Sequence, residues 1–172
     1  MMKLYQTYKL HLNSTISLFY SLILVLLSFS AFSQEHPPRP LQISTFQNLS
    51  FGAFIPGPGS GKVIIDPQGS RSVTGGIIPT SIMGFPYGPA IFEIDAIPGS
   101  LIYINFGPPV FLTGPGGSLK LHVDTSLPNS PFINTKSTKT QVRIGGTLDV
   151  ENIATNHAGN YTGSFSITFV QQ

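Results

Sequence analysis

The fold class of this 172-residue chain is decided by one stretch, Tyr161-Thr162-Gly163-Ser164-Phe165-Ser166-Ile167-Thr168-Phe169-Val170. Large side chains stand at its odd positions, and Thr or Ser fills most of its even positions. This period of two places one row of side chains in an apolar core and the other row in water. A turn-forming cluster, residues 156–160, precedes it. The stretch therefore predicts a single β-strand of a small β-sandwich.

The first 33 residues have the layout of a secretory signal peptide. Lys3 and Lys9 supply positive charge, residues 16–27 form a mostly apolar run, and Ala31 and Ser33 precede the cleavage position. The alternative is a membrane anchor, but the apolar run of about a dozen residues is shorter than the roughly 20 that span a bilayer. We therefore expect export, no membrane span after cleavage, and a secreted, periplasmic or cell-surface location.

Removal of the signal peptide changes the charge balance. The chain has nine Lys and Arg against seven Asp and Glu. Without Lys3 and Lys9, seven basic residues face seven acidic ones, so no electrostatic footprint for a nucleic acid remains. The remainder is long enough for one domain, and we predict a proline-rich flexible lead-in at 34–40 followed by a single domain at 41–172.

Turn signals separate short alternating runs throughout that domain. Pro98-Gly99 is typical of a type II turn, so the runs 90–97 and 101–106 are predicted to form a hairpin. Gly145-Gly146 is predicted to separate two strands, 141–144 and 147–150. In all, the pattern predicts an all-β, immunoglobulin-like or pilin-like β-sandwich of about eight or nine strands.

One glycine-rich segment, residues 57–62, has the composition of a phosphate-binding loop. Such a loop needs Gly five residues before its Gly-Lys pair, then Ser or Thr, then a helix. Pro56 and Val63 occupy those positions, and a strand is predicted to follow. We interpret the segment as a turn.

Two carboxylate pairs are candidates for a calcium site or an acid–base pair: Glu93 with Asp95, and Asp149 with Glu151. Each pair alternates with apolar residues, which favours a solvated sheet face. The chain has no Cys and its four His are scattered, which argues against a zinc site. We predict no catalytic residues, no cofactor and no metal. The enzymatic alternative requires acids and His that cluster in space.

Phe85 and Tyr87 lie among Pro86, Gly88 and Pro89. Aromatic side chains in such a loop can stack on a sugar or contact a partner protein, or they can cap the open end of a sandwich. They are the candidate contacts if the chain is a soluble carbohydrate- or protein-binding module.

The order of several short motifs resembles domain-of-unknown-function family 4402 over roughly residues 41–170. These motifs are Leu49-Ser50-Phe51-Gly52, Ser70-Arg71-Ser72-Val73-Thr74-Gly75-Gly76, Pro98-Gly99, Gly145-Gly146-Thr147-Leu148 and Gly159-Asn160-Tyr161-Thr162-Gly163-Ser164-Phe165. The resemblance implies an exported bacterial protein with a pilin-like or adhesin-like sandwich. It also implies a looser relation to fimbrial subunits, which assemble when an N-terminal segment of one subunit completes the sheet of the next. The chain departs from those pilins by having no disulfide and by having Gln171 where they place an aromatic residue.

These observations favour a non-enzymatic structural or adhesive protein that contacts itself or other surface proteins by strand addition. Leu41, Ile43 and Thr45 alternate directly after the prolines and are the candidate residues of a donated strand. Glycans are the partners under the alternative hypothesis of a binding module.

Overall fold

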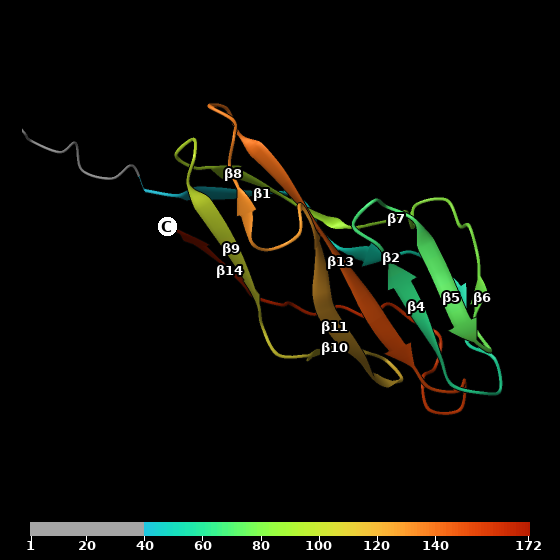
Figure 1. Ribbon diagram of the computed structural model, residues 1–172. Coiled ribbons are helices and arrows are strands. Elements are labelled where there is room, and N and C mark those ends of the chain that lie inside the picture. The colour runs from blue at the N-terminus through green and yellow to red at the C-terminus, as the bar shows by residue number, and fades with distance from the viewer. Residues whose placement is uncertain (1–39) are drawn as a thin grey trace, which may run out of the picture. The chain divides into compact units, whose positions relative to one another are not determined.

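The computed structural model describes residues 40–172, and these form an all-β fold (Figure 1). The predicted signal peptide and the lead-in up to residue 39 lie outside the described residues. Within residues 40–172 there is no helix, and hence none that could cross a membrane. The strands are β1 (Gln42–Gln47), β2 (Ser50–Phe51), β3 (Phe54–Ile55), β4 (Gly61–Ile65), β5 (Arg71–Gly75), β6 (Ile78–Pro79), β7 (Tyr87–Gly88), β8 (Ala90–Asp95), β9 (Leu101–Phe106), β10 (Val110–Gly114), β11 (Gly117–Leu127), β12 (Phe132–Ile133), β13 (Thr140–Val150) and β14 (Ile167–Gln171).

The described residues thus contain fourteen strands, more than the eight or nine predicted. Five of the fourteen have only two residues: β2, β3, β6, β7 and β12. Runs this short lie between prolines and glycines and carry no visible alternation. They therefore leave no periodic signal in the sequence.

The larger sheet has seven strands and is organised around β13. The first half of β13 pairs with β8 and its second half pairs with β4, while β11 runs along its other side. The predicted break at Gly145-Gly146 is wrong, because the strand continues through both glycines. A Cβ on Gly145 would lie 2.5 Å from the carbonyl oxygen of Ile65. Glycine is therefore required there for close approach where the neighbouring strand changes, and it does not make a turn.

The smaller sheet has three strands in the order β12-β9-β14. The predicted hairpin between 90–97 and 101–106 is wrong, because β8 belongs to the larger sheet and β9 to the smaller one. The turn itself is present: Gly99 has φ 87° and the Ser100 amide donates to the Ile97 carbonyl over 3.1 Å. The turn carries the chain from the larger sheet to the smaller one. Turn residues alone do not show whether the two strands that they join pair with each other or belong to different sheets.

The final segment, residues 161–171, runs alongside β10 and then β9, and so it contacts both sheets. Thr162 bridges Thr113 of β10, and farther on β14 pairs with β9 from Ile167 opposite Phe106 to Gln171 opposite Ile102. The prediction of one strand from Tyr161 to Val170 is therefore too long, since regular pairing begins at Ile167. Its alternation is confirmed, because Phe165, Ile167 and Phe169 all pack against the core.

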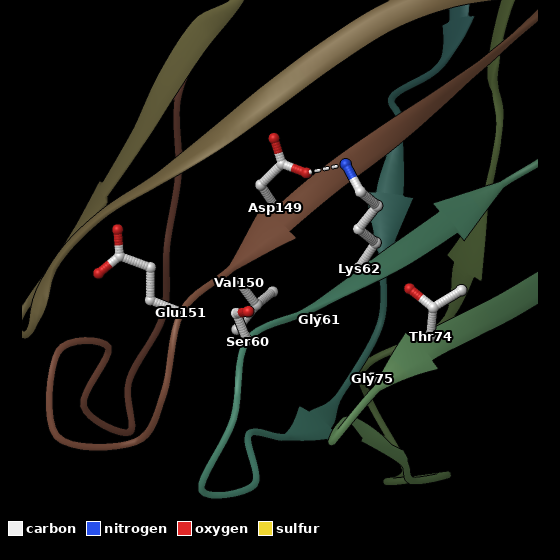
Figure 2. A pocket seen from close by; sticks show the side chains of 8 residues that line it. All are labelled: Ser60, Gly61, Lys62, Thr74, Gly75, Asp149, Val150 and Glu151. Atoms are coloured by element: carbon white, nitrogen blue, oxygen red, sulfur yellow. Dashed lines mark hydrogen bonds and ion pairs between the residues drawn. The ribbon is translucent and has the colours of Figure 1, made fainter.

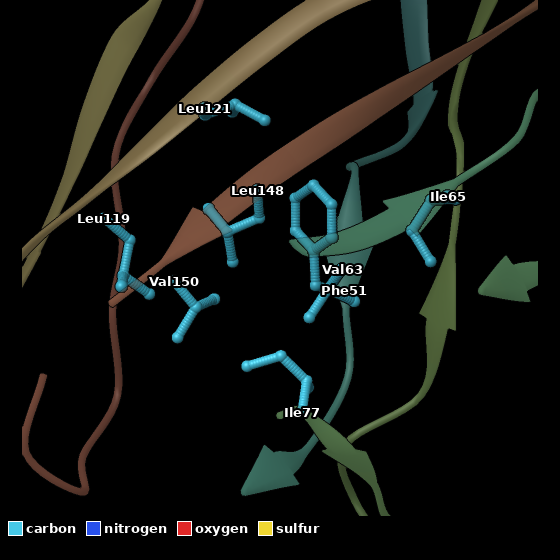
Figure 3. Close-up of a cluster of buried hydrophobic side chains, with 8 residues drawn as sticks. All are labelled: Phe51, Val63, Ile65, Ile77, Leu119, Leu121, Leu148 and Val150. Atoms are coloured by element: carbon cyan, nitrogen blue, oxygen red, sulfur yellow. The ribbon is translucent and has the colours of Figure 1, made fainter. Parts of the chain in front are cut away.

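Two clusters of buried hydrophobic side chains form the core. One joins the sheets, with Ile94 and Val142 of the larger sheet and Ile102 and Phe169 of the smaller sheet. The other lies under β4, β11 and the second half of β13, and Figure 3 shows its side chains pointing toward one another. Leu49, Val123 and Phe165 pack against both clusters, so the core is continuous. This arrangement is consistent with a β-sandwich.

A buried polar side chain fixes the turn between the sheets. Asn134 is only 1 % exposed, and its amide group donates to the carbonyls of Ala96, Ile97 and Lys136. Its side-chain oxygen accepts a hydrogen bond of 2.7 Å from the hydroxyl of Thr140, at the start of β13. Asn134, which directly follows β12, therefore holds the end of β8 and the start of β13 together.

Candidate functional site

The predicted donated-strand residues lie at the edge of the larger sheet. Ile43 and Thr45 belong to β1, with Leu41 directly before it, and β1 pairs with β8 of its own chain. All six residues of β1 are exposed, and none is charged. Ile43 lies opposite the fully buried Ile94, so its side chain is on the core side of the sheet and is still 47 % exposed. The core-facing side of β1 is thus only partly covered and contacts solvent at Ile43.

A bulge interrupts this edge near its end. The pairing passes from Thr45 opposite Phe92 to Gln47 opposite Ile91, which leaves Phe46 as the extra residue. Phe46 is 65 % exposed. The side-chain amide of Gln47 donates to the Pro89 carbonyl over 2.9 Å and anchors the end of β1 against the start of β8. The free edge available for pairing is therefore the segment before the bulge.

Phe85 and Tyr87 lie in a second region, the apolar loop, which we define as residues 78–87. Arg71 of β5 clamps the base of this loop. Its guanidinium donates to the carbonyls of Phe51, Ala53 and Thr80 at 2.9–3.2 Å and lies 4.3 Å from the ring centroid of Tyr87. One face of the Tyr87 ring is therefore occupied by a cation, and the ring is held in place. Phe85 is half exposed, and no cation of residues 40–172 lies over its ring.

The apolar loop gathers exposed hydrophobic side chains. Of the twelve large hydrophobic residues that are exposed in residues 40–172, six belong to this loop or to its strand partner Ile55. Ile55 lies opposite Ile78, and Met83 is 99 % exposed. The members are Ile55, Ile78, Ile82, Met83, Phe85 and Tyr87. An exposed concentration of this kind is typical of an interaction site. The sequence pattern indicated only its two aromatic members, Phe85 and Tyr87.

Charged side chains lie mainly on the outer face of the larger sheet. Lys62 of β4 and Asp149 of β13 pair over 2.6 Å, and His122 of β11 contacts the other carboxylate oxygen over 3.1 Å. The hydrogen bond from Lys62 lowers the pKa of Asp149 below its ordinary value, burial opposes this shift, and the charges of Lys62 and His122 add to it. An open hollow of about 430 Å³ lies beside this group, lined also by Ser60, Thr74 and Glu151 (Figure 2). The side chains of Lys62, Asp149 and His122 thus connect the adjacent strands β4, β13 and β11.

The other predicted carboxylate pair is engaged in a similar way. Glu93 of β8 forms an ion pair of 3.1 Å with Lys139, just before β13. Among residues 40–172 no three His, Cys, Asp or Glu side chains are grouped as they would be to hold a metal ion. The glycine-rich segment 57–62 runs directly into β4, as a turn before a strand does.

Sequence reasoning missed the residues that hold the loops. Arg71 is one residue of a polar alternating run, and nothing in its spacing indicates that it bonds to three carbonyls. Asn134 and Asn156, which are 1 % and 3 % exposed, look like ordinary loop asparagines in the sequence. Asn156 accepts from the Glu151 amide and donates to the Ser118 carbonyl. Such contacts depend on segments far apart in the chain.

Comparison with known proteins identifies the family. No curated protein and no solved structure matches the chain. The model of one protein family, described as a domain of unknown function (DUF4402), matches residues 41–170, which is almost the entire described part of the chain. This confirms the resemblance found in the motifs. The chain belongs to the DUF4402 family.

Proposed function

We propose that this chain is an exported, non-enzymatic structural or adhesive protein of the cell surface or periplasm. In this proposal it is a bacterial, fimbria-like subunit with an immunoglobulin-like or pilin-like sandwich. It contacts itself or other surface proteins by strand addition. The observation that carries the proposal is β1, a strand of six uncharged residues that is exposed along its whole length at the edge of the larger sheet.

The physical basis is the free backbone of an edge strand. The N–H and C=O groups on the open side of β1 have no strand partner in residues 40–172, and such a row is a template for another extended segment. Ile43 adds an apolar contact on the core side of the same edge. An incoming strand gains main-chain hydrogen bonds and also covers Ile43.

The contacts of the ionisable residues support a structural role for them. Asp149 binds both Lys62 and His122, and Glu93 binds Lys139. All lie on or beside the outer face of a sheet and connect neighbouring strands. They act as cross-strand pairs of a solvated face.

The test compares self-association of residues 34–172 with that of an Ile43→Lys variant, by sedimentation velocity up to millimolar concentration. Ile43 is half exposed, so a lysine there leaves the fold intact but places a charge at the open edge. We expect concentration-dependent oligomers from the parent and a clear loss of them in the variant. Gln141→Lys, at an exposed position of the central strand β13, is the matched control. A parent chain that stays monomeric at millimolar concentration contradicts the proposal, and deletion of residues 34–45 provides a second variant.

The second candidate function is a soluble carbohydrate- or protein-binding module that uses the apolar loop. It is favoured by Phe85, which is 50 % exposed, and by the Arg71 clamp that holds Tyr87 beside it. A glycan array with the parent and a Phe85→Ser variant tests it, with Phe111→Ser as the control because Phe111 is an exposed aromatic on β10. Binding that Phe85→Ser abolishes and Phe111→Ser keeps supports a glycan partner, whereas no binding above background removes the glycan hypothesis.

A further inference from the structure

The edge strands of the two sheets differ in how they are protected against pairing with another chain. Natural edge strands avoid such pairing through bulges, charged residues, prolines, short length or a covering segment. In the described residues β1, β5, β10, β12 and β14 each have a single strand neighbour in their sheet. Four of these five have at least one of those protections.

The four protected edges are each protected in a different way. The edge of β1 carries the bulge at Phe46, which protects only the end of that strand and leaves residues 42–45 open for the pairing proposed above. The charged Arg71 stands in β5. The edge of β10 is covered at Thr113, whose amide donates to the Thr162 carbonyl over 2.8 Å. The fourth strand, β12, is only two residues long and directly follows Pro131.

Within residues 40–172, the strand β14 has none of these features. Its sequence, Ile-Thr-Phe-Val-Gln, has no charge and no proline, and its five residues pair with β9 in unbroken register. The whole sheet that it borders is uncharged, since β12, β9 and β14 contain no Asp, Glu, Lys, Arg or His. A second copy of this sheet can therefore approach without placing like charges opposite each other.

We propose that β14 is a self-association site at which two copies of the chain pair their β14 strands antiparallel around a two-fold axis. This inference rests on the proposed function, because it names a partner for a surface protein that acts by strand addition. Full overlap of two five-residue antiparallel strands places Phe169 opposite Phe169 of the second copy. Thr168 then lies opposite Val170 of the second copy, and the two small sheets join into one sheet of six strands.

The side chains fit this arrangement on both faces. Thr168 and Val170 point to the outer face with Asn105 and Tyr103 of β9, their register partners, and all four are uncharged. Ile167 and Phe169 point to the core. A symmetric contact of this kind closes as a dimer. Combined with the separate contact at β1, it links dimers into longer assemblies.

Cysteine cross-linking tests the register, because the chain contains no Cys and every disulfide formed is an introduced one. Opposite residues of an antiparallel pair have Cβ atoms about 4.5–5.5 Å apart, and diagonal ones are about 7–8 Å apart. A Thr168→Cys chain mixed with a Val170→Cys chain, under mild oxidation at millimolar protein, should give several times more covalent dimer than either variant alone. Gln141→Cys, which is exposed on the larger sheet, sets the background. Dimer yields at that background in the mixture overturn the inference.

A second measurement separates this inference from the proposed function. Thr168 is exposed, so Thr168→Lys should preserve the thermal unfolding midpoint while it weakens association in sedimentation velocity. If Thr168→Lys leaves oligomers unchanged and Ile43→Lys removes them, the β14 inference is wrong and the proposed function stands. If Thr168→Lys reduces the oligomers to the species that the β1 contact alone supports, both stand. A parent chain that remains monomeric contradicts both.

Discussion

The outer faces of the two sheets differ sharply in chemistry. The larger sheet carries Lys62, Glu93, Arg143, Asp149 and other charged residues on strands that are joined by ion pairs. The smaller sheet has no charged residue in any of its strands. Both sheets nevertheless bury the same kind of aliphatic core. The larger sheet therefore presents charged side chains to water, whereas the strands of the smaller sheet place no charge in the way of the association proposed at β14.

The largest expected effect is on the smaller sheet, which is held by apolar burial. Phe169 of β14 is 8 % exposed and its ring lies edge-on to Phe92 at a centroid distance of 5.7 Å. Phe169→Ala should lower the free energy of unfolding by about 3–5 kcal/mol, measured by urea denaturation. The control Phe111→Ala, at a position 60 % exposed on the larger sheet, should change it by less than about 0.5 kcal/mol. If Phe169→Ala lowered the free energy of unfolding as little as the control does, β14 would not be part of the core.

The junction between the sheets should be the next most sensitive point. Asn134→Ala removes the acceptor of the buried Thr140 hydroxyl and the donor to three carbonyls. Because these groups stay buried without their partner, we expect a loss of about 2–3 kcal/mol in the same assay. Asn105→Ala, at an exposed position of β9, is the matched control and should be nearly neutral. Similar values for the two variants would mean that the sheets do not depend on this link.

On the larger sheet, Arg71 tests whether a charged group stabilises structure through hydrogen bonds. Arg71→Lys keeps the charge but lacks the planar group that reaches three carbonyls and stacks on Tyr87. We expect a loss of about 1–2 kcal/mol, together with faster proteolysis within residues 78–87. Unchanged stability and an unchanged cleavage rate would show that the apolar loop is held by other contacts.

The smallest effect is expected from the ion pairs on the outer face. Asp149 has a pKa below its ordinary value of 3.8, so its charged form stabilises the fold above that pH, and the contribution is lost as pH falls through the lower folded-state pKa. Asp149→Asn should cost less than about 1 kcal/mol near neutral pH, because the side chain is one-third exposed. In urea titrations the difference from the parent should begin to shrink as pH falls below 3.8, and it should vanish once the pH lies below the folded-state pKa of Asp149. A difference that persists there would assign it to packing and not to charge.

Much of the core was predictable from periodicity. The alternation of the final stretch places Phe165, Ile167 and Phe169 on one face, and all three pack against the core. Such patterns report which face of a strand is covered. They do not report which strand lies beside it, and for that reason the hairpin at Pro98-Gly99 was predicted wrongly.

The candidate sites were predictable only in part. Alternation and exposed aromatics led to β1 and to Phe85 and Tyr87, which the structure places at a sheet edge and in a loop. Arg71 and Asn134 were not found, because their partners are backbone carbonyls that approach only in the folded chain. The unprotected state of β14 was also hidden, since an edge strand and a central strand can have the same alternation.

Residues 101–114 and residues 161–171 run side by side through both sheets. This arrangement determines how the domain unfolds locally. Each of the two segments pairs with the other in the smaller sheet at β9 and again beside β10 in the larger one. Both segments pass from the smaller sheet to the larger one, so the two layers are joined by two chain crossings and by a continuous core. Amide hydrogen exchange should therefore show β9 and the centre of β13 opening together, with the free energy of global unfolding.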